Sequence, residues 1–182
     1  MATSRWNIDP THSGVHFTVR HMVISKVRGS FDRYQGSIEF DPANPAASKV
    51  SVSIEAGSIN TREPKRDEHL RSPDFFDAAQ FPALTFTSTK VEKVSDAELR
   101  VTGDLTIHGV TRAVTLETEF AGGGKDPWGN ERLGFSATAS INRKDFGLNW
   151  NQVLEAGGVL VGEKIEIALD VQAIRAQATQ AA

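Results

Sequence analysis

The stretch 11-THSGVHFTVRHM-22 decides the fold class of this chain. Every second residue is apolar at Val15, Phe17 and Val19, and His21 continues the same side. The intervening positions are mostly polar and carry His12, His16, Thr18 and Arg20. Successive side chains of a strand point to opposite faces of a sheet, so this alternation predicts a half-buried β-strand. What its apolar face meets, a packed core or a cavity that holds something else, depends on the rest of the chain.

The same alternation recurs in seven further segments, with a parity change at 32–35 that predicts a β-bulge. They span residues 29–40, 50–56, 84–88, 99–107, 114–120, 135–141 and 165–171. The outer faces are rich in Thr, Ser, Glu and Lys, which is typical of an antiparallel sheet wetted on one side. Closure into an eight-stranded antiparallel barrel would remove the sheet edges. We therefore predict an all-β barrel, with a two-sheet sandwich as the alternative.

Three segments break the strand pattern. Residues 62–79 predict a short helical insertion, because Asn60 followed by Glu63 resembles a capping box and Pro64 suits a first helical turn. The charged run 65–71 is expected on the surface. The glycine-rich segment 121–131 predicts a loop. Residues 143–158 predict an irregular connection.

Length and composition exclude several classes of function. The 182 residues predict one domain over 1–175, and the Ala/Gln-rich tail 176–182 is predicted to be disordered. The chain has no cysteine, which excludes disulfides, thiolate metal sites and cysteine nucleophiles. The net charge of -3 and the lack of a basic run argue against nucleic acid. No apolar run approaches the ~20 residues of a membrane span, and no signal peptide is evident, so we expect a cytoplasmic protein.

The histidines do not form a metal motif. His12 and His16 share one face, but four residues of strand separate them by ~13 Å at ~3.3 Å per residue. Zinc–nitrogen bonds are only ~2 Å long, so one ion cannot bridge the pair. A structural role is favoured for His21, through the backbone or Ser25. We predict no metal and no cofactor, and a metal-binding module is the weakest alternative.

Catalytic motifs are also missing. No G-x-S-x-G elbow occurs. The run Gly122–Gly124 is not a P-loop, because Glu119 stands where the first glycine is required and Asp126 replaces the Ser or Thr. The chain therefore offers no positive evidence for an enzyme. An enzyme that uses His21 on a lipid-like substrate stays as an alternative.

The inner faces mix aromatic with small side chains. The aromatic members are Phe31, Phe40, Phe86 and Phe135, and the small ones are Gly29, Gly36, Ala56, Ser88, Gly103, Ala137 and Ala139. Such a mixture leaves room for a long apolar guest, or else large and small residues interdigitate in a filled core. Arg20 and Arg28 belong to the mouth of a barrel or to ordinary surface.

Four sequence blocks resemble the YceI-like polyisoprenoid-binding family. They read WNIDPTHSGVHFTVRHMVISKVRGSF, RDEHLRSPDFFDAAQFP, GDLTIHGVTRAVTLE, and GFSATASINRKDFGLNWN with EAGGVLVGEKIEI. They occur in the family's order and extend from Trp6 to Val171. The resemblance implies an elongated lipocalin-like barrel whose pore holds an isoprenoid, such as a polyprenyl or quinone lipid. It also implies a frequent homodimer and no known catalytic activity.

Parity then supplies the expected ligand contacts within such a pore. The strand residues are Phe17, Val19, Phe31, Phe86, Leu105, Phe135, Ile141, Ile165 and Leu169, with His21 at the end of the barrel. Phe75, Phe76, Phe146, Trp150 and Leu154, from the two irregular segments, are expected to cover an end of the pore. The predicted function is non-catalytic binding, transport or storage of a long apolar lipid. A structural barrel with a filled core is a further alternative.

Overall fold

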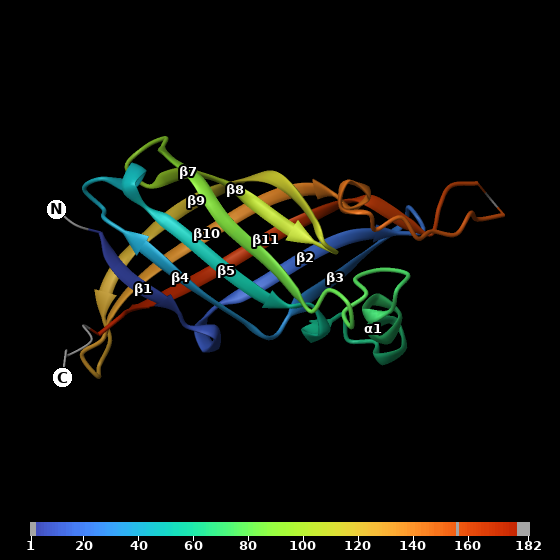
Figure 1. Ribbon diagram of the computed structural model, residues 1–182, viewed down its shortest axis with the longest axis horizontal. Helices are drawn as coiled ribbons and strands as arrows, with labels where there is room; N and C mark the ends of the chain where they lie inside the picture. Colours follow the sequence, from blue (N-terminus) through green and yellow to red (C-terminus); the bar gives the residue numbers. More distant parts are fainter. Residues whose placement is uncertain (1–2, 156, 178–182) are drawn as a thin grey trace.

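Antiparallel strands wind into an elongated barrel in a computed structural model that describes residues 3–155 and 157–177 (Figure 1). The strands are β1 (Ser4–Ile8), β2 (Gly14–His21), β3 (Ser25–Phe31), β4 (Tyr34–Phe40), β5 (Lys49–Glu55), β6 (Ile59–Asn60), β7 (Ala83–Lys93), β8 (Glu98–Ile107), β9 (Val110–Lys125), β10 (Glu131–Asn142) and β11 (Val161–Arg175). The helix α1 spans Pro64–Arg71. Four 3₁₀ turns complete the set: η1 (Pro10–His12), η2 (Pro45–Ala47), η3 (Ala56–Ser58) and η4 (Arg143–Phe146).

Short interruptions divide three of the barrel's eight strands into two pieces each. Because β1 and β2 both pair with β11, they form one strand interrupted by η1, and β3 with β4 forms its hairpin partner. The third divided strand is β5 with β6. Each strand then pairs with its neighbour in the chain, and β1 and β2 close the ring against β11. The predicted eight-stranded antiparallel barrel is confirmed, and the sandwich alternative is wrong.

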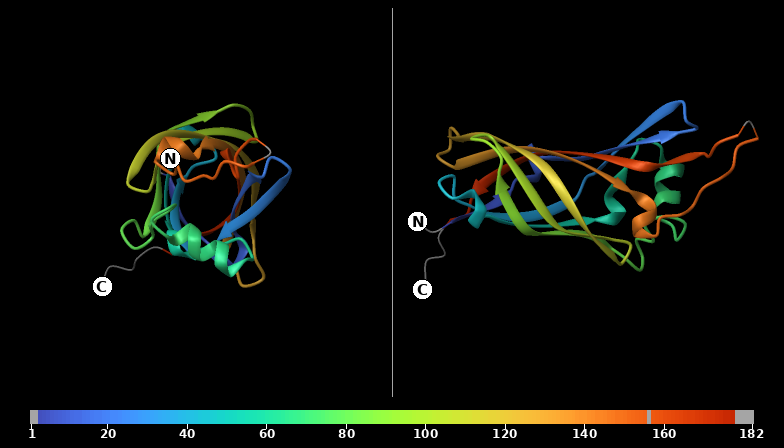
Figure 2. Two further views of the ribbon diagram at one scale, coloured as in Figure 1. Left: turned by 90° about the vertical axis from the view of Figure 1, so that its right-hand side faces the viewer. Right: turned by 90° about the horizontal axis from the view of Figure 1, so that it is seen from above.

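The two ends of the barrel differ. Both described chain ends and the β9–β10 turn lie at one end, and α1 lies at the other (Figures 1 and 2). The β2–β3 hairpin and the loop that joins η4 to β11 project past α1 at that second end. Residues 178–182 of the tail predicted to be disordered lie outside the described residues. Ala176, at the start of that tail, donates a backbone hydrogen bond to Arg5 O at 2.9 Å.

The helical insertion is present, but its cap differs from the prediction. The N-cap is Glu63, whose carboxylate accepts from Arg66 N at 2.6 Å. Asn60 instead accepts from Arg62 N at 2.9 Å, which makes an Asx turn before the helix. Asp67 was expected on the surface but is buried. Its carboxylate accepts hydrogen bonds from the amide and the hydroxyl of Thr61, which offset the cost of burying it. This bond ties α1 to the end of β6.

The prediction of a loop over residues 121–131 is wrong for the first half of that segment. The strand β9 continues through the glycines to Lys125, and only 126–130 forms the turn. The register shifts by one residue beside Gly134, and Gly122 there takes a φ of 101°, which favours glycine. The shift leaves an extra residue in β9, as in a β-bulge. The glycines therefore shape the strand rather than end it.

Candidate functional site: an apolar cavity along the barrel

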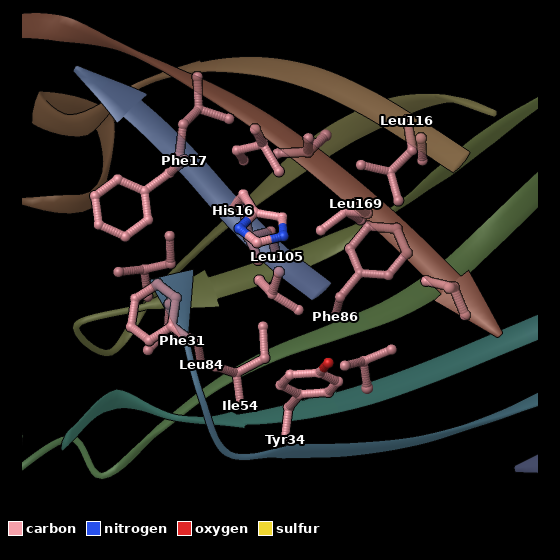
Figure 3. A pocket seen from close by; sticks show the side chains of 18 of the residues that line it. His16, Phe17, Phe31, Tyr34, Ile54, Leu84, Phe86, Leu105, Leu116 and Leu169 are labelled. Atoms are coloured by element: carbon pink, nitrogen blue, oxygen red, sulfur yellow. The ribbon is translucent and has the colours of Figure 1, made fainter. Parts of the chain in front are cut away.

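The barrel encloses a cavity of about 260 Å³ (Figure 3). One water needs only about 10–15 Å³ of such space, so the cavity is far larger than a packing defect. Its wall comes from the inward faces of all eight strands and is almost wholly carbon. Burial raises the pKa of the Tyr34 hydroxyl on this wall, so the phenol stays neutral. The cavity therefore suits an uncharged, apolar guest.

Aromatic rings close the end near the chain termini. Phe40, Phe120 and Phe135 form a triangle with ring centroids 5.1–5.3 Å apart. These separations fall in the favourable range for aromatic pairs. Trp6 is buried in the same cluster. We call this triangle the floor of the cavity.

The opposite end is covered by the insertion that carries α1. Phe31 contacts Phe17 and Phe76, with both centroid distances at 5.7 Å. Phe75 also lines the cavity, and Trp150 packs against it from the neighbouring loop at 5.3 Å. These side chains form a cover over the α1 end, defined here as Phe75, Phe76 and Trp150.

Two inward glycines do not open the cavity. A side chain at Gly29 would meet the ring of Phe17 at 2.4 Å, and one at Gly103 would meet the ring of Phe86 at 2.6 Å. The aromatic rings lie over the glycine backbones, as in the aromatic rescue of strand glycines. At these positions large and small residues interdigitate, which is the second of the two alternatives that the sequence left open.

Arg143 fixes the loop beside the cover. Its buried guanidinium donates to Leu148 O at 2.7 Å, Trp150 O at 2.8 Å and Gly162 O at 2.8 Å. Burial lowers the pKa of this guanidinium below its usual value, and Glu163 opposes the shift. An arginine stays protonated even so, because its ordinary pKa is far above neutrality. The guanidinium charge of Arg143 is thus stabilised by hydrogen bonds to backbone carbonyls, and the bond to Trp150 O fixes the position of Trp150.

The structure places most of the predicted contacts on the cavity wall. The lining includes Phe17, Val19, Phe31, Phe75, Phe76, Phe86, Leu105, Phe135, Ile141, Ile165 and Leu169. That these side chains touch a lipid stays a prediction.

Four predicted contacts lie outside the cavity lining. Phe146 is buried in the core around it, and Trp150 covers the α1 end from outside. Leu154 belongs to the projecting loop, where its N donates to Gly158 O. His21 lies near the hairpin tip, and Ser25 donates to its backbone carbonyl at 3.4 Å rather than to its ring. His21 is therefore not among the residues that line the cavity.

Several lining residues were missed by the sequence argument. Some share the parity of the predicted residues and were findable by the same rule: Val15, Ile38, Val50, Val52, Ile54, Leu84, Val101, Ile107, Val114, Leu116, Ile167 and Val171. Leu70 and Leu148 come from α1 and a loop, where period two gives no signal. The one available clue was that Leu70 is the single apolar residue of a charged helix.

Potential metal ligands are scattered over the described part of the chain. Within residues 3–155 and 157–177, no three His, Asp or Glu side chains lie together as a metal site would require. No helix in the same residues has the length and apolar character to cross a membrane.

Comparison with known proteins places the chain in a family. The YceI-like domain matches residues 6–173. The chain belongs to the YceI-like family. It is 48% identical to Protein YceI of Escherichia coli O157:H7 over 137 residues, which cover 75% of this chain and 71% of that one.

Solved structures share the YceI-like barrel. The crystal structure of Burkholderia cenocepacia BcnA matches with a TM-score of 0.80 at 23% identity, over 91% of this chain and 98% of that one. A polyisoprenoid binding domain from Saccharophagus degradans matches with a TM-score of 0.68 at 16% identity, over 96% and 99% of the two chains. At these identities the likeness shows the fold alone.

Proposed function

We propose that this chain binds a long-chain isoprenoid, of the polyprenyl or quinone type, inside its barrel and stores or carries it unchanged. The observation that carries the proposal is the apolar cavity along the axis of a closed barrel. The name of the Saccharophagus degradans neighbour, a polyisoprenoid binding domain, supports the same ligand class. No step of this function requires chemistry on the ligand.

The energy of such binding comes from removing apolar surface from water. Drug-sized ligands gain about 0.3 kcal/mol per heavy atom, so about twenty enclosed carbons supply about 6 kcal/mol. This corresponds to a dissociation constant of the order of tens of micromolar, and a longer enclosed chain binds more tightly. The polar residues among those that line the cavity are few, and a head group can use one of them: Ser13, His16, Tyr34, Ser48, Thr118 and Arg143. Selection by chain length is therefore expected to exceed selection by head group.

Native mass spectrometry of the purified protein, followed by organic extraction, tests the proposal. We expect a bound lipid whose recovered mass equals that of the free lipid, and uptake of an added polyprenol by emptied protein. A straight-chain alkane alcohol of equal carbon number is the matched competitor. Protein that carries no lipid and takes up neither polyprenol nor quinone would contradict the proposal. A chemically altered lipid would favour the enzyme alternative.

The family resemblance also implies a homodimer. We propose that state for the protein in solution, and sedimentation equilibrium measures it directly.

A further inference from the structure

The tip of the β2–β3 hairpin exposes three consecutive apolar side chains. Met22, Val23 and Ile24 are 43%, 65% and 84% exposed. Ile24 N donates to His21 O, and both central residues of this turn have positive φ, 54° at Met22 and 63° at Val23. Such turns favour Asn and Gly, and a β-branched residue in this conformation is an outlier. The hairpin tip thus exposes apolar side chains to water and has an unfavourable turn conformation. Neither feature stabilises the fold.

A second apolar tip lies beside the first. In the loop between η4 and β11, Val153 and Val159 form an isolated bridge and are both exposed. Met22 N donates to Leu160 O at 2.7 Å, so the hairpin joins this loop directly. Both tips project past α1 at the covered end of the barrel (Figure 2). Together they form one apolar prow, defined as Met22, Val23, Ile24, Val153 and Val159.

A basic collar stands behind the prow. Arg20 and Lys26 are directly opposite each other in the hairpin register, and Arg28 lies opposite Thr18 on the same outer face. Like charges in such a pair are destabilising. None of the three forms a salt bridge within the residues that the structure describes.

The acidic neighbours of the collar are already paired. Glu163 and Glu166, which border Arg20 and Lys26, pair with Lys144 at 2.7 Å and Lys164 at 3.5 Å. At about 3.3 Å per residue, Arg20 and Lys26 lie about 7 Å behind Met22 and Ile24, and Arg28 lies about 13 Å behind Ile24.

We propose that the prow docks on a lipid bilayer that contains anionic lipids. Interfacial elements bury their apolar face about 5–10 Å deep, and the collar then lies at the level of the head groups. Phosphate-bearing lipids supply negative charge to Arg20, Lys26 and Arg28, whose bordering acids Glu163 and Glu166 pair with Lys144 and Lys164 instead. Docking would present the α1 end of the barrel to the bilayer, and this purpose rests on the proposed lipid binding.

A second copy of the chain fits the same surface poorly. A two-fold symmetric contact places a patch against itself. The collar would then face an identical collar, so three cations would oppose three cations, and the bordering acids Glu163 and Glu166 already pair with Lys144 and Lys164. An anionic bilayer meets both the apolar and the charged requirement.

Vesicle co-sedimentation of the full chain tests the docking. We expect binding to phosphatidylcholine vesicles that contain phosphatidylglycerol, weaker binding to pure phosphatidylcholine, and loss of the difference at high salt. Ile24→Ser should weaken binding at least about tenfold, because three apolar carbons no longer enter the bilayer. Lys26→Gln should weaken it about fivefold. The matched control is Trp128→Ser, because Trp128 is 82% exposed in the β9–β10 turn at the opposite end.

Three results would overturn the docking. They are no binding to either vesicle, equal losses in Ile24→Ser and Trp128→Ser, and a dimer that Ile24→Ser dissolves. Thermal unfolding of each variant confirms that it is folded. Vesicles without isoprenoid and protein emptied of lipid separate the two proposals. Binding of this emptied protein to such vesicles tests the docking alone, whereas uptake of added polyprenol by the same protein tests the proposed function alone.

Discussion

Arg143 shows how one residue sets the shape of the cavity cover. Its guanidinium serves carbonyls on both sides of the loop that carries Trp150. Arg143→Met keeps the aliphatic stem but leaves these buried carbonyls without donors. We expect a loss of about 2–4 kcal/mol in the free energy of unfolding, because each orphaned polar group costs about 1–3 kcal/mol.

Urea unfolding measures this loss, and two further variants make it specific. Arg143→Lys should lose less, since an ammonium still donates to some of the carbonyls. Lys144→Met, which removes a half-exposed neighbour paired with Glu163, should cost at most about 1 kcal/mol. Equal losses for Arg143→Met and Lys144→Met would contradict the role of Arg143.

Substitution of the turn residues Met22 and Val23 is expected to raise the stability of the protein and to weaken its docking on the bilayer. The double variant Met22→Asn with Val23→Gly places residue types that favour positive φ where the backbone already has it. Each left-handed L-residue costs about 1–2 kcal/mol. Asn keeps part of this cost and Gly loses more conformational entropy on folding, so we expect the free energy of unfolding of the double variant to rise by only about 1 kcal/mol. The same variant should bind anionic vesicles less well. A less stable double variant would show that the turn has no such strain.

At the scale of elements, one ionic network joins distant pieces of the barrel. Arg132 on β10 donates to Asp9 Oδ2 and to Asp126 Oδ2, both at 2.8 Å. Asp9 precedes η1, and Asp126 opens the β9–β10 turn. The Thr11 hydroxyl and then Arg132 hold the pKa of Asp9 well below its usual range, and Arg132 does the same for Asp126. The network therefore links the break between β1 and β2 to the β9–β10 turn.

These lowered pKa values predict an acid-sensitive contribution to stability. A carboxyl whose folded pKa lies below its unfolded value stabilises the fold fully above about pH 4. This contribution is lost as the pH falls from about 4 toward the folded pKa, because the folded state must then take up protons. We expect the free energy of unfolding to fall below about pH 4 in the native chain and to fall less in Arg132→Met. Equal slopes in urea unfolding across this pH range would contradict the prediction.

How far the sequence predicts an element depends on whether its structure has a period. The strands β8 and β11 have two-residue patterns and were predicted over most of their lengths. The strand β7 was predicted only as far as Ser88, because its register shifts between Ser88 and Lys90 and the apolar parity changes there. The cap at Glu63 was missed because Asn60 offers an equally good local signal. The strand through Gly122–Gly124 was missed because glycines carry no side-chain pattern, and only the pairing with β10 shows it.

The sequence predicted which side chains of the strands face the barrel interior, but it did not predict how much of that interior is empty. Parity tells which side of a strand faces inward, so residues such as Phe17 and Leu169 were assigned to the wall. Whether the inside is empty depends on side-chain rotamers across the barrel, as the rings over Gly29 and Gly103 show. His21 has the parity of Val19 but lies at the end of β2, beyond the residues that line the cavity, and parity alone does not tell where along a strand the cavity ends.

At the scale of the whole molecule, ring closure makes a cavity compatible with a stable fold. Every barrel strand has a partner on both sides, and β11 binds β10 along one edge and β1 and β2 along the other. The backbone hydrogen bonds are therefore satisfied without a filled centre. The packed floor and the cover at the α1 end add apolar contacts at the two ends. Side-chain packing in the middle of the tube therefore contributes least to the stability of the fold.

A cavity-filling variant tests this division directly. Ala137 lines the cavity on β10, and Ala137→Phe places a ring in the existing space. In a filled core, added bulk costs about 1–3 kcal/mol. In an open tube we expect the free energy of unfolding of emptied protein to stay within about 1 kcal/mol of native or to rise, because the ring buries apolar surface. Lipid uptake should fall, because the ring occupies the volume of the guest.

The matched control is Ala168→Phe, the same substitution at an exposed position on the outer face of β11. It should leave lipid uptake unchanged. Urea unfolding gives the stability of each variant, and native mass spectrometry gives its bound lipid. If Ala137→Phe is destabilised by several kcal/mol, the tube is packed in solution. If it is stable and takes up polyprenol as the native chain does, the guest lies elsewhere. A stable Ala137→Phe that takes up no lipid, beside an Ala168→Phe that does, assigns the cavity as the binding site.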